Sequence, residues 1–339
     1  MVVLSVVEAS NARIKTLPPG LVAVFVGATN GVGETTLKQF CKYAIRPRVY
    51  FIGRSQEAGG RIKQECEALS PEGTFVFIQR ETSLMRNVDA ICEEIKSKEE
   101  TINLLFLSVG TLQVDAETEE GLAYAAALTI YARNRFISAL LPLLRRAQNL
   151  RRVMSVYSAT FEGNIHMDDF QAARIGLMAK QGHMASIITL AMEGHHQAAP
   201  EVSFVHNFPG SVKSGIDRGS IGPLMRTLKT VFILLAPLVN IPLEEAGDRH
   251  LFLCTSARYG AGVDDEAAGV ALTDGLALAR GTDGQNGSGV YSIDAYGESA
   301  MPKVEALLAN MRQDGMVKKV QDMIEADIDR ALASSKGAL

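Results

Sequence analysis

Seven short apolar runs, separated by longer segments with helical character, constrain the fold of this 339-residue chain more than any other feature. Each run has the length of a β-strand and is apolar at successive positions, as in a parallel sheet covered by helices on both faces. The runs are Leu21–Val26, Arg48–Ile52, Thr74–Ile78, Ile102–Leu107, Arg152–Tyr157, Val202–Phe208 and Gly289–Asp294. The intervening segments are long enough for right-handed crossover helices. The sequence therefore predicts an α/β fold with a doubly wound, parallel, seven-stranded sheet.

The runs are spread over most of the chain, which favours a single domain, 1–339, rather than two. We expect a core over 21–258, preceded by a helical extension over 1–20. A long excursion over 215–243, whose second half is apolar, predicts a lid. Residues 259–288, rich in Gly, Ala and Asp, predict a flexible surface insertion.

The C-terminal part, 289–339, would supply the last strand and the C-terminal helices. Apolar residues recur at helical spacing between Met301 and Leu332, with a break near Gly315. Such a face packs either on the edge of the sheet or against a second copy of the chain. A homodimer contact is therefore kept as the alternative.

The composition and the cysteines exclude several classes of protein. Hydrophobic residues make up 47% and charged residues 21%, and the net charge is −4, which argues against a nucleic-acid partner that neutralises phosphates. The four cysteines have neither CxxC nor Cys/His spacing, so no metal site or disulfide framework is expected. The longest nearly apolar run, Val231–Leu243, is shorter than the about 20 residues that span a bilayer. We expect a cytoplasmic protein without a stable membrane span.

A glycine-rich segment follows the first predicted strand and precedes a helix-like run. Glycines at such a turn let the backbone approach a pyrophosphate, and the N–H groups at the start of the helix favour its negative charge. In this context the pattern predicts a dinucleotide site in a Rossmann fold; the alternative is that the glycines serve the turn alone. The candidate cofactor-binding residues are Gly27, Thr29, Asn30, Gly31, Val32 and Gly33.

The GxxxGxG spacing of this segment resembles that of the short-chain dehydrogenase/reductase family. VGATNGVG matches the family's TGxxxGxG, LSVG after the fourth strand aligns with NNAG, and PGSVKS after the sixth matches PGxVxT. Several longer stretches resemble uncharacterised reductase-like proteins of filamentous fungi, some associated with secondary metabolism. The resemblance implies cofactor contacts from Glu81, Ser108, Gly110, Pro209, Gly210, Val212 and Ser214.

The end of the second strand indicates which nucleotide is preferred. An NAD site usually places an acidic residue there to bind the ribose 2′-hydroxyl. Here Arg54 and Ser55 stand at that point, and a guanidinium with a hydroxyl suits a 2′-phosphate. The sequence therefore predicts NADP(H) as the cofactor.

The catalytic residues that the resemblance implies are largely replaced. The family uses Asn, Ser, Tyr and Lys, with Tyr and Lys one helical turn apart on the helix that we expect over 172–195. Counting back from Pro209-Gly210 places Lys180 at the Tyr position and Met184 at the Lys position, and Thr129 stands at the Asn position. Ser158, next to Tyr157, alone keeps its expected role.

A different proton donor is then required, and the candidates are Tyr157, Ser158, Lys180 and His183. Two further histidines, His195 and His196, suit the negative end of the helix dipole. Three interpretations remain open. The chain is an NADP(H)-dependent oxidoreductase acting on a small lipophilic metabolite, a redox-neutral isomerase or cyclase that keeps the dinucleotide site, or an inactive nucleotide-binding protein. We favour the first.

Overall fold

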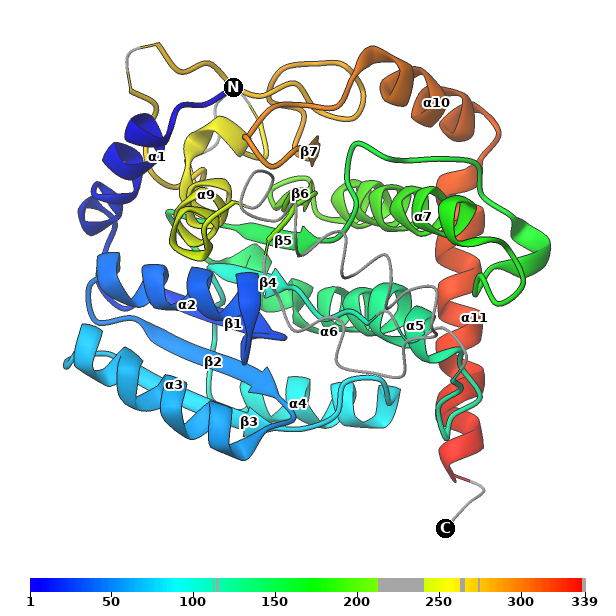
Figure 1. The fold of residues 1–339 in the computed structure, drawn as a ribbon, viewed down its shortest axis with the longest axis horizontal. Helices are drawn as coiled ribbons and strands as arrows, with labels where there is room; N and C mark the ends of the chain where they lie inside the picture. Colours follow the sequence, from blue (N-terminus) through cyan, green and yellow to red (C-terminus); the bar gives the residue numbers. More distant parts are fainter. Residues whose placement is uncertain (112, 114–115, 213–240, 263–265, 274, 337–339) are drawn as a thin grey trace, which may run out of the picture.

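The computed structural model describes residues 1–111, 113, 116–212, 241–262, 266–273 and 275–336, and its seven strands form one parallel sheet (Figure 1). The order across the sheet is β3-β2-β1-β4-β5-β6-β7. The strands are β1 Val22–Val26, β2 Arg48–Gly53, β3 Thr74–Gln79, β4 Leu104–Leu107, β5 Arg152–Val156, β6 Ser203–Asn207 and β7 Val290–Ile293. Each coincides with one of the predicted runs, and β2 and β3 extend one residue further, to Gly53 and Gln79. The expected α/β Rossmann fold is confirmed.

The strand order reverses its direction between β1 and β4, which are hydrogen-bonded neighbours. Loops that leave the carboxyl ends of two such strands run to opposite faces of the sheet and open a crevice, where doubly wound sheets bind their ligands. The glycine segment follows β1 and the LSVG segment closes β4. The fold thus brings both predicted cofactor segments to the same crevice.

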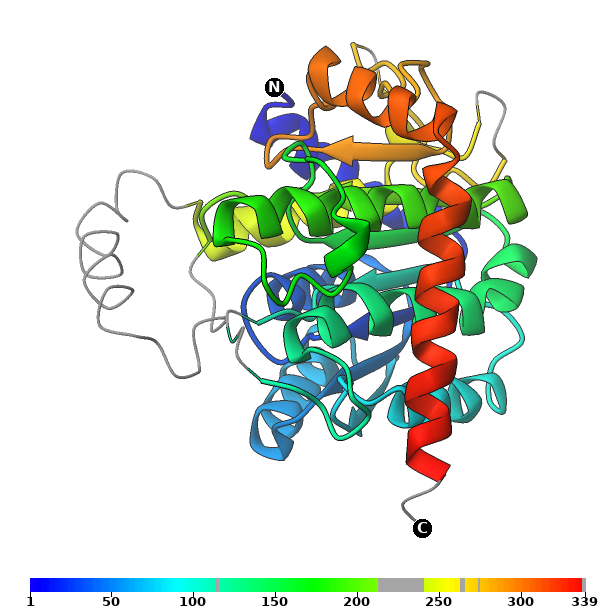
Figure 2. The ribbon, with the colours of Figure 1, turned by 90° about the vertical axis from the view of Figure 1, so that its right-hand side faces the viewer.

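Helices cover both faces of the sheet (Figures 1 and 2). One face packs against α2, α3 and α9, with α1 outside α9, and the other packs against α4, α6 and α7. The bounds are α1 Leu4–Asn11, α2 Gly31–Tyr43, α3 Gln56–Leu69, α4 Met85–Lys96, α5 Tyr124–Ala126, α6 Ala132–Arg146, α7 Leu177–Ala198, α9 Leu243–Thr255, α10 Pro302–Gln313 and α11 Met316–Lys336. A π-helical turn, η2 Ala127–Tyr131, joins α5 to α6.

The C-terminal helices pack on the body of the same chain. Gly315, with φ +69°, separates α10 from α11 at the predicted break. In Figure 2, α11 crosses over α7 and α6 toward α4. Its apolar side chains, among them Val320, Ile324 and Ile328, are buried in the core that includes these helices. The apolar face is therefore used within the chain, and a homodimer stays a prediction.

The segment predicted as an insertion is held to the sheet by hydrogen bonds. The buried Arg152 guanidinium on β5 donates to the carbonyl oxygen of Ala268 at 3.0 Å, and the N–H of Val270 donates to Thr255 at 2.7 Å. Most of the predicted lid, 215–243, lies outside the described residues, and the described part is the beginning of α9. Among the described helices, none is long and apolar enough to cross a membrane.

The helix predicted over 172–195 begins later and ends later, since α7 spans Leu177–Ala198. Ala172 explains the late start, because its φ of +54° lies in the left-handed region and cannot continue a right-handed helix. The Asp169 carboxylate then stabilises the loop that follows. It accepts hydrogen bonds from the N–H groups of Ala173, Arg174 and Ile175 at 3.0, 2.8 and 3.0 Å. These bonds hold the residues before α7 in a loop, and they lower the pKa of the Asp169 carboxyl.

Candidate functional site

The segment from the end of β1 into the first turn of α2 leaves no room for side chains at two of its glycines. Gly27 has φ +89°, and a Cβ there would lie 2.8 Å from the backbone nitrogen of Val109. A Cβ on Gly33 would lie 2.6 Å from the carbonyl oxygen of Gly27 and 2.6 Å from the hydroxyl of Ser108. The turn therefore packs its backbone directly on the end of β4, as a close approach to a ligand requires.

The start of α2 faces the same turn and has no side-chain cap. Asn30 precedes the helix in an extended conformation, and its side chain makes no capping hydrogen bond. The first backbone N–H groups of a helix lack partners within the helix, and they attract anions. Together with the two tight glycines, this uncapped N-terminus forms a cradle that fits the pyrophosphate of a dinucleotide. We call these residues, 27–33, the nucleotide cradle.

The other predicted cradle residues contact the neighbouring strands. Thr29 lies against Gly53 at the end of β2, where a Cβ would come within 2.3 Å of the Thr29 methyl group. The Val32 carbonyl accepts a hydrogen bond from the Thr36 hydroxyl at 2.7 Å inside α2. The Ser108 hydroxyl donates a hydrogen bond to the carbonyl oxygen of Gly27 at 3.3 Å. These contacts fix the cradle to β2 and β4.

The segment after β6 borders the same edge of the sheet. Gly210 has φ +74°, and a Cβ there would lie 2.9 Å from the side chain of Ile241. Val212 pairs with Ile241 in a parallel bridge, so the chain leaving Pro209 is held near the start of α9. Gly110 follows β4 on the far side of the cradle. Ser214 lies outside the described residues.

Arg54 stands at the end of β2, where the sequence predicts it, but it has a partner that the sequence did not indicate. Its guanidinium lies 3.2 Å from the Glu81 carboxylate and donates to the Tyr124 hydroxyl at 2.9 Å. The Arg54 side chain is 66% exposed, and an exposed pair of this kind contributes about 0–1 kcal/mol, so a phosphate can displace it. Ser55 caps α3 by accepting from the N–H of Ala58 at 3.2 Å.

Tyr157 and Ser158 leave β5 at the same edge of the sheet. The Tyr157 N–H donates to the carbonyl oxygen of Asn207 at 2.8 Å, and the phenol oxygen lies 3.5 Å from the sulfur of Met184 on α7. Burial raises the pKa of the Tyr157 phenol, and the positive charge of Arg133 partly offsets this. The Ser158 hydroxyl, nearly buried, accepts from the side-chain amide of Gln181 at 3.3 Å.

The two α7 candidates differ in their surroundings. Lys180 is buried in the first turn of α7, one turn before Met184. His183 is fully buried, and both ring nitrogens have backbone partners: Nδ1 accepts from the His166 N–H at 3.0 Å, and Nε2 donates to the Phe170 carbonyl at 2.9 Å. Burial also lowers its pKa. These contacts give His183 a role in fixing the loop before α7.

Thr129, at the position where the family has Asn, is buried in the π-helical turn between α5 and α6. Such turns inside helices are frequent at functional sites. The turn is followed at once by Arg133, which sequence reasoning missed. A single arginine in a helix resembles a solvated surface residue, and only the apolar residues around it in YARNRF indicated a buried face.

A buried polar cluster lies behind the loop that follows Ser158. The Glu162 carboxylate accepts from the hydroxyls of Thr189 and Ser292 at 2.9 and 2.6 Å, and burial raises its pKa. His206 contacts Thr189 at 2.9 Å through Nδ1. Burial lowers the pKa of His206 to about 3, so the ring is neutral. The loop enters this cluster through Thr160, whose N–H donates to Ser292 at 2.8 Å and whose φ is +68°, a strained value for a β-branched residue.

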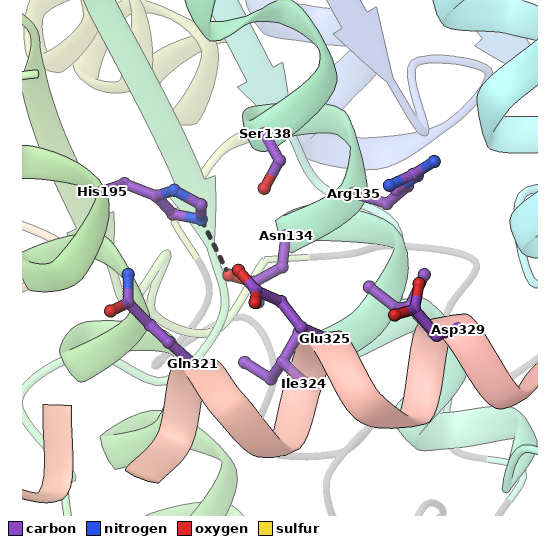
Figure 3. A pocket seen from close by; sticks show the side chains of 9 residues that line it. Asn134, Arg135, Ser138, His195, Gln321, Ile324, Glu325 and Asp329 are labelled. Atoms are coloured by element: carbon purple, nitrogen blue, oxygen red, sulfur yellow. Dashed lines mark hydrogen bonds between the residues drawn. The ribbon is translucent and has the colours of Figure 1, made fainter. Parts of the chain in front are cut away.

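A separate cavity of about 240 Å³ lies between α6, α7 and α11 (Figure 3). His195 donates through Nε2 to the side-chain oxygen of Asn134 at 3.1 Å, and Glu325 and Gln321 line the cavity from α11. Burial lowers the pKa of His195 to about 4. The ring is therefore uncharged at neutral pH, and the expected interaction of a charged His195 with the helix dipole is wrong.

Comparison with known proteins decides the family, although no protein-family model matches the chain. The chain is 36% identical over 337 residues to "Oxidoreductase AN1596" of Emericella nidulans, covering 98% of this chain and 99% of that protein. It is 28% identical over 339 residues to "Short-chain dehydrogenase/reductase SAT2" of Stachybotrys chartarum, covering 92% and 93%. The chain belongs to the short-chain dehydrogenase/reductase (SDR) family of oxidoreductases.

A solved SDR fold supports the same architecture. L-sorbose reductase from Gluconobacter frateurii, in complex with NADPH and L-sorbose, superposes with a TM-score of 0.54 at 15% identity. The match covers 76% of this chain and 97% of that one. At this identity the likeness shows the fold alone. The SDR sheet and crevice are therefore shared, and the chemistry must be argued from this chain's own residues.

Proposed function

We propose that this protein is an NADP(H)-dependent oxidoreductase that acts on a carbonyl, enone or imine group of a small lipophilic secondary metabolite or its precursor. The proposal rests on one observation, which is that the nucleotide cradle and two candidate proton donors lie at the same edge of the sheet. The nucleotide cradle packs on Val109 after β4, and Tyr157 and Ser158 follow β5, the next strand in the sheet.

The preference for a 2′-phosphorylated nucleotide rests on Arg54. The end of β2 carries no carboxylate of its own, and the exposed guanidinium exchanges its weak pair with Glu81 for a phosphate at little cost. Ser55 keeps its hydroxyl hydrogen for a further acceptor, because it accepts rather than donates in its capping bond. The NADPH bound to the structurally similar L-sorbose reductase agrees with this choice.

Two observations favour a lipophilic substrate. Phe161, three residues after Ser158, exposes 48% of its surface and packs edge-to-face on Phe208, with the ring centroids 4.9 Å apart. An aromatic pair with one exposed ring, three residues after Ser158, is suited to hold an apolar ligand. The resemblance to fungal reductase-like proteins associated with secondary metabolism points to the same substrate class.

The proposed chemistry uses a non-standard proton donor. A bound NADPH would supply the hydride, and the chain must supply the proton that completes the reduction. Tyr157 and Ser158 are the donors that we propose, since their hydroxyls belong to adjacent residues at the carboxyl end of β5. Lys180 remains a further candidate on α7. His183 is the weakest candidate, because both of its ring nitrogens are already bonded.

The test is to mix the protein with NADPH and a panel of apolar ketones, enones and cyclic imines. The loss of nicotinamide absorbance and the masses of the products are followed together. We expect nicotinamide oxidation matched by a reduced product, and little of either with the Ser158→Ala/Tyr157→Phe double variant. A product formed without nicotinamide oxidation would support the isomerase or cyclase instead. Nucleotide binding without any product across the panel would support a nucleotide-binding protein.

A further inference from the structure

We propose that Arg133 is a positioning residue that supplies a positive charge beside Tyr157 and ties the Tyr157 backbone to the nucleotide cradle. This inference rests on the proposed function, in which Tyr157 donates a proton. Arg133 itself does not touch the substrate. It acts through the phenol.

The contacts of Arg133 join the two strands that border the site. Its Nη1 donates to the carbonyl oxygen of Leu107 at 2.8 Å and to the hydroxyl of Ser155 at 2.6 Å. Its Nη2 donates to the carbonyl oxygens of Val109 and Val156. Val109 is the residue against which Gly27 packs, and Val156 directly precedes Tyr157. The Arg133 guanidinium thus joins Val109, on which the nucleotide cradle packs, to Val156, the residue before Tyr157.

The charge of Arg133 is not paired with a carboxylate. Its hydrogen-bond acceptors are three backbone carbonyls and one hydroxyl, and within the described residues it makes no ion pair. The side chain is 2% exposed. Burial lowers the pKa of Arg133 to about 10, which still leaves it protonated at neutral pH. A buried cation without a counter-ion is costly, and it stabilises any negative charge that forms nearby.

The charge of Arg133 lowers the pKa of a titratable neighbour, the Tyr157 phenol. The elements packed around it carry other titratable groups, which are Lys180, His183, Glu193, His195 and His196 on α7, His206 on β6, and Arg135, Arg145 and Arg146 on α6. Burial lowers the pKa of His183, His195 and His206, so these rings are neutral. The Met184 thioether, which contacts the phenol oxygen, is also uncharged, and Arg133 is the charge that acts on the phenol. Arg133 therefore favours the phenolate that remains when Tyr157 gives up its proton.

The proton balance of the step is simple. In reduction, the substrate carbon accepts the hydride of the nucleotide, and the substrate oxygen or nitrogen accepts the phenol proton. Tyr157 is left as a phenolate beside Arg133 and regains a proton from water. In oxidation, the phenolate accepts the proton of the alcohol or amine instead. Arg133 lowers the cost of the phenolate in both directions.

The experiment measures the ionisation of Tyr157 by ultraviolet difference titration of each protein against its Tyr157→Phe counterpart. The proteins are the wild type, Arg133→Met, Arg133→Lys and Lys180→Met, with folding checked by circular dichroism. We expect Arg133→Met to raise the pKa of Tyr157 by at least about one unit, a tenfold change in its dissociation constant. Arg133→Lys keeps the charge and should restore most of the shift, and Lys180→Met should leave the pKa in place.

Two results would overturn the proposal. One is an unchanged Tyr157 pKa in folded Arg133→Met, and the other is a larger shift in Lys180→Met. If Arg133→Met does not fold, Arg133→Gln decides, because it removes the charge and keeps side-chain N–H donors for the carbonyls. It should raise the pKa of Tyr157 by a similar amount, and an unchanged pKa would overturn the proposal. The titration needs no nucleotide, so failure of the proposed function appears separately, as an absence of nicotinamide oxidation.

Discussion

The phenol oxygen of Tyr157 lies 3.5 Å from the sulfur of Met184. A thioether is a weak acceptor without charge, so it can hold the phenol in place but cannot favour its ionisation. Met184 is fixed on α7, which follows the loop held by Asp169, and Tyr157 is fixed by the β5–β6 pairing. The distance between the two side chains thus follows from the fold rather than from a local turn.

Met184→Lys should lower the pKa of Tyr157. An ammonium placed beside the phenol favours the phenolate, by about one unit at this separation. The measurement is the same difference titration against Tyr157→Phe. Met184→Leu, which changes the packing without adding a charge, is the matched control and should leave the pKa near its wild-type value. An equal shift in both variants would mean that packing, not charge, governs the phenol.

Ser158→Ala or Tyr157→Phe should each lower turnover by at least about tenfold. This is below the about 10²–10⁴-fold that a general acid contributes, because two neighbouring hydroxyls share the task. Turnover is measured with saturating NADPH on whichever substrate the panel identifies, and nucleotide binding serves as the control. Full turnover of the double variant with intact binding would place the chemistry on α7 instead.

Gly33→Ala should weaken NADPH binding by at least tenfold. Its Cβ would lie 2.6 Å from the Gly27 carbonyl, which forces the cradle to open. Gly60→Ala on α3 is the matched control, since nothing lies within 4 Å of that Cβ. It should leave binding unchanged and stabilise the protein by up to about 1 kcal/mol through helix propensity. Calorimetric binding and thermal melts check both variants, and similar binding by the two would argue against the cradle.

The neutral His195 predicts a loss of stability in acid. Burial lowers its pKa from the ordinary value of 6.5 to about 4 in the folded protein. The unfolded chain therefore binds this proton first as the pH falls, and the stabilisation present above pH 6.5 is lost progressively down to about pH 4. His195→Gln keeps a donor for Asn134 without the titration. Denaturant unfolding should show the wild type losing stability relative to this variant over that range, whereas a constant difference would mean that His195 keeps its ordinary pKa in the folded protein.

The strands were predictable because their apolar runs reflect burial on both faces, which is a local property of the sequence. The start of α7 was not. Residues 172–176 have helical character, but Ala172 adopts φ +54°, which a right-handed helix cannot contain, and Asp169 binds the three N–H groups that follow it. A single residue in the left-handed region and one side chain reaching forward over several residues are features that apolar periodicity does not reveal.

Some parts of the candidate site were also predictable from the sequence, and others were not. The cradle is a short-range feature, so its glycines could be recognised from spacing and position after a strand. Arg54 was found as well, but its pairing with Glu81 depends on two loops that meet only in the folded sheet. Arg133 was missed because its acceptors lie on or just after β4 and on β5, more than 20 residues away along the chain, and they meet it only in the folded sheet.

Calorimetric titration of NADPH and NADH into the wild type and Arg54→Asp decides whether Arg54 selects a 2′-phosphorylated nucleotide. Lys63→Asp, the same charge reversal on the exposed face of α3, is the control. The wild type and Lys63→Asp should bind NADPH roughly ten- to hundredfold more tightly than NADH, as a charge-assisted contact with the 2′-phosphate requires. Arg54→Asp should lose that preference while it keeps its affinity for NADH. Equal affinities of the wild type for the two nucleotides, or no binding of either, would contradict the account.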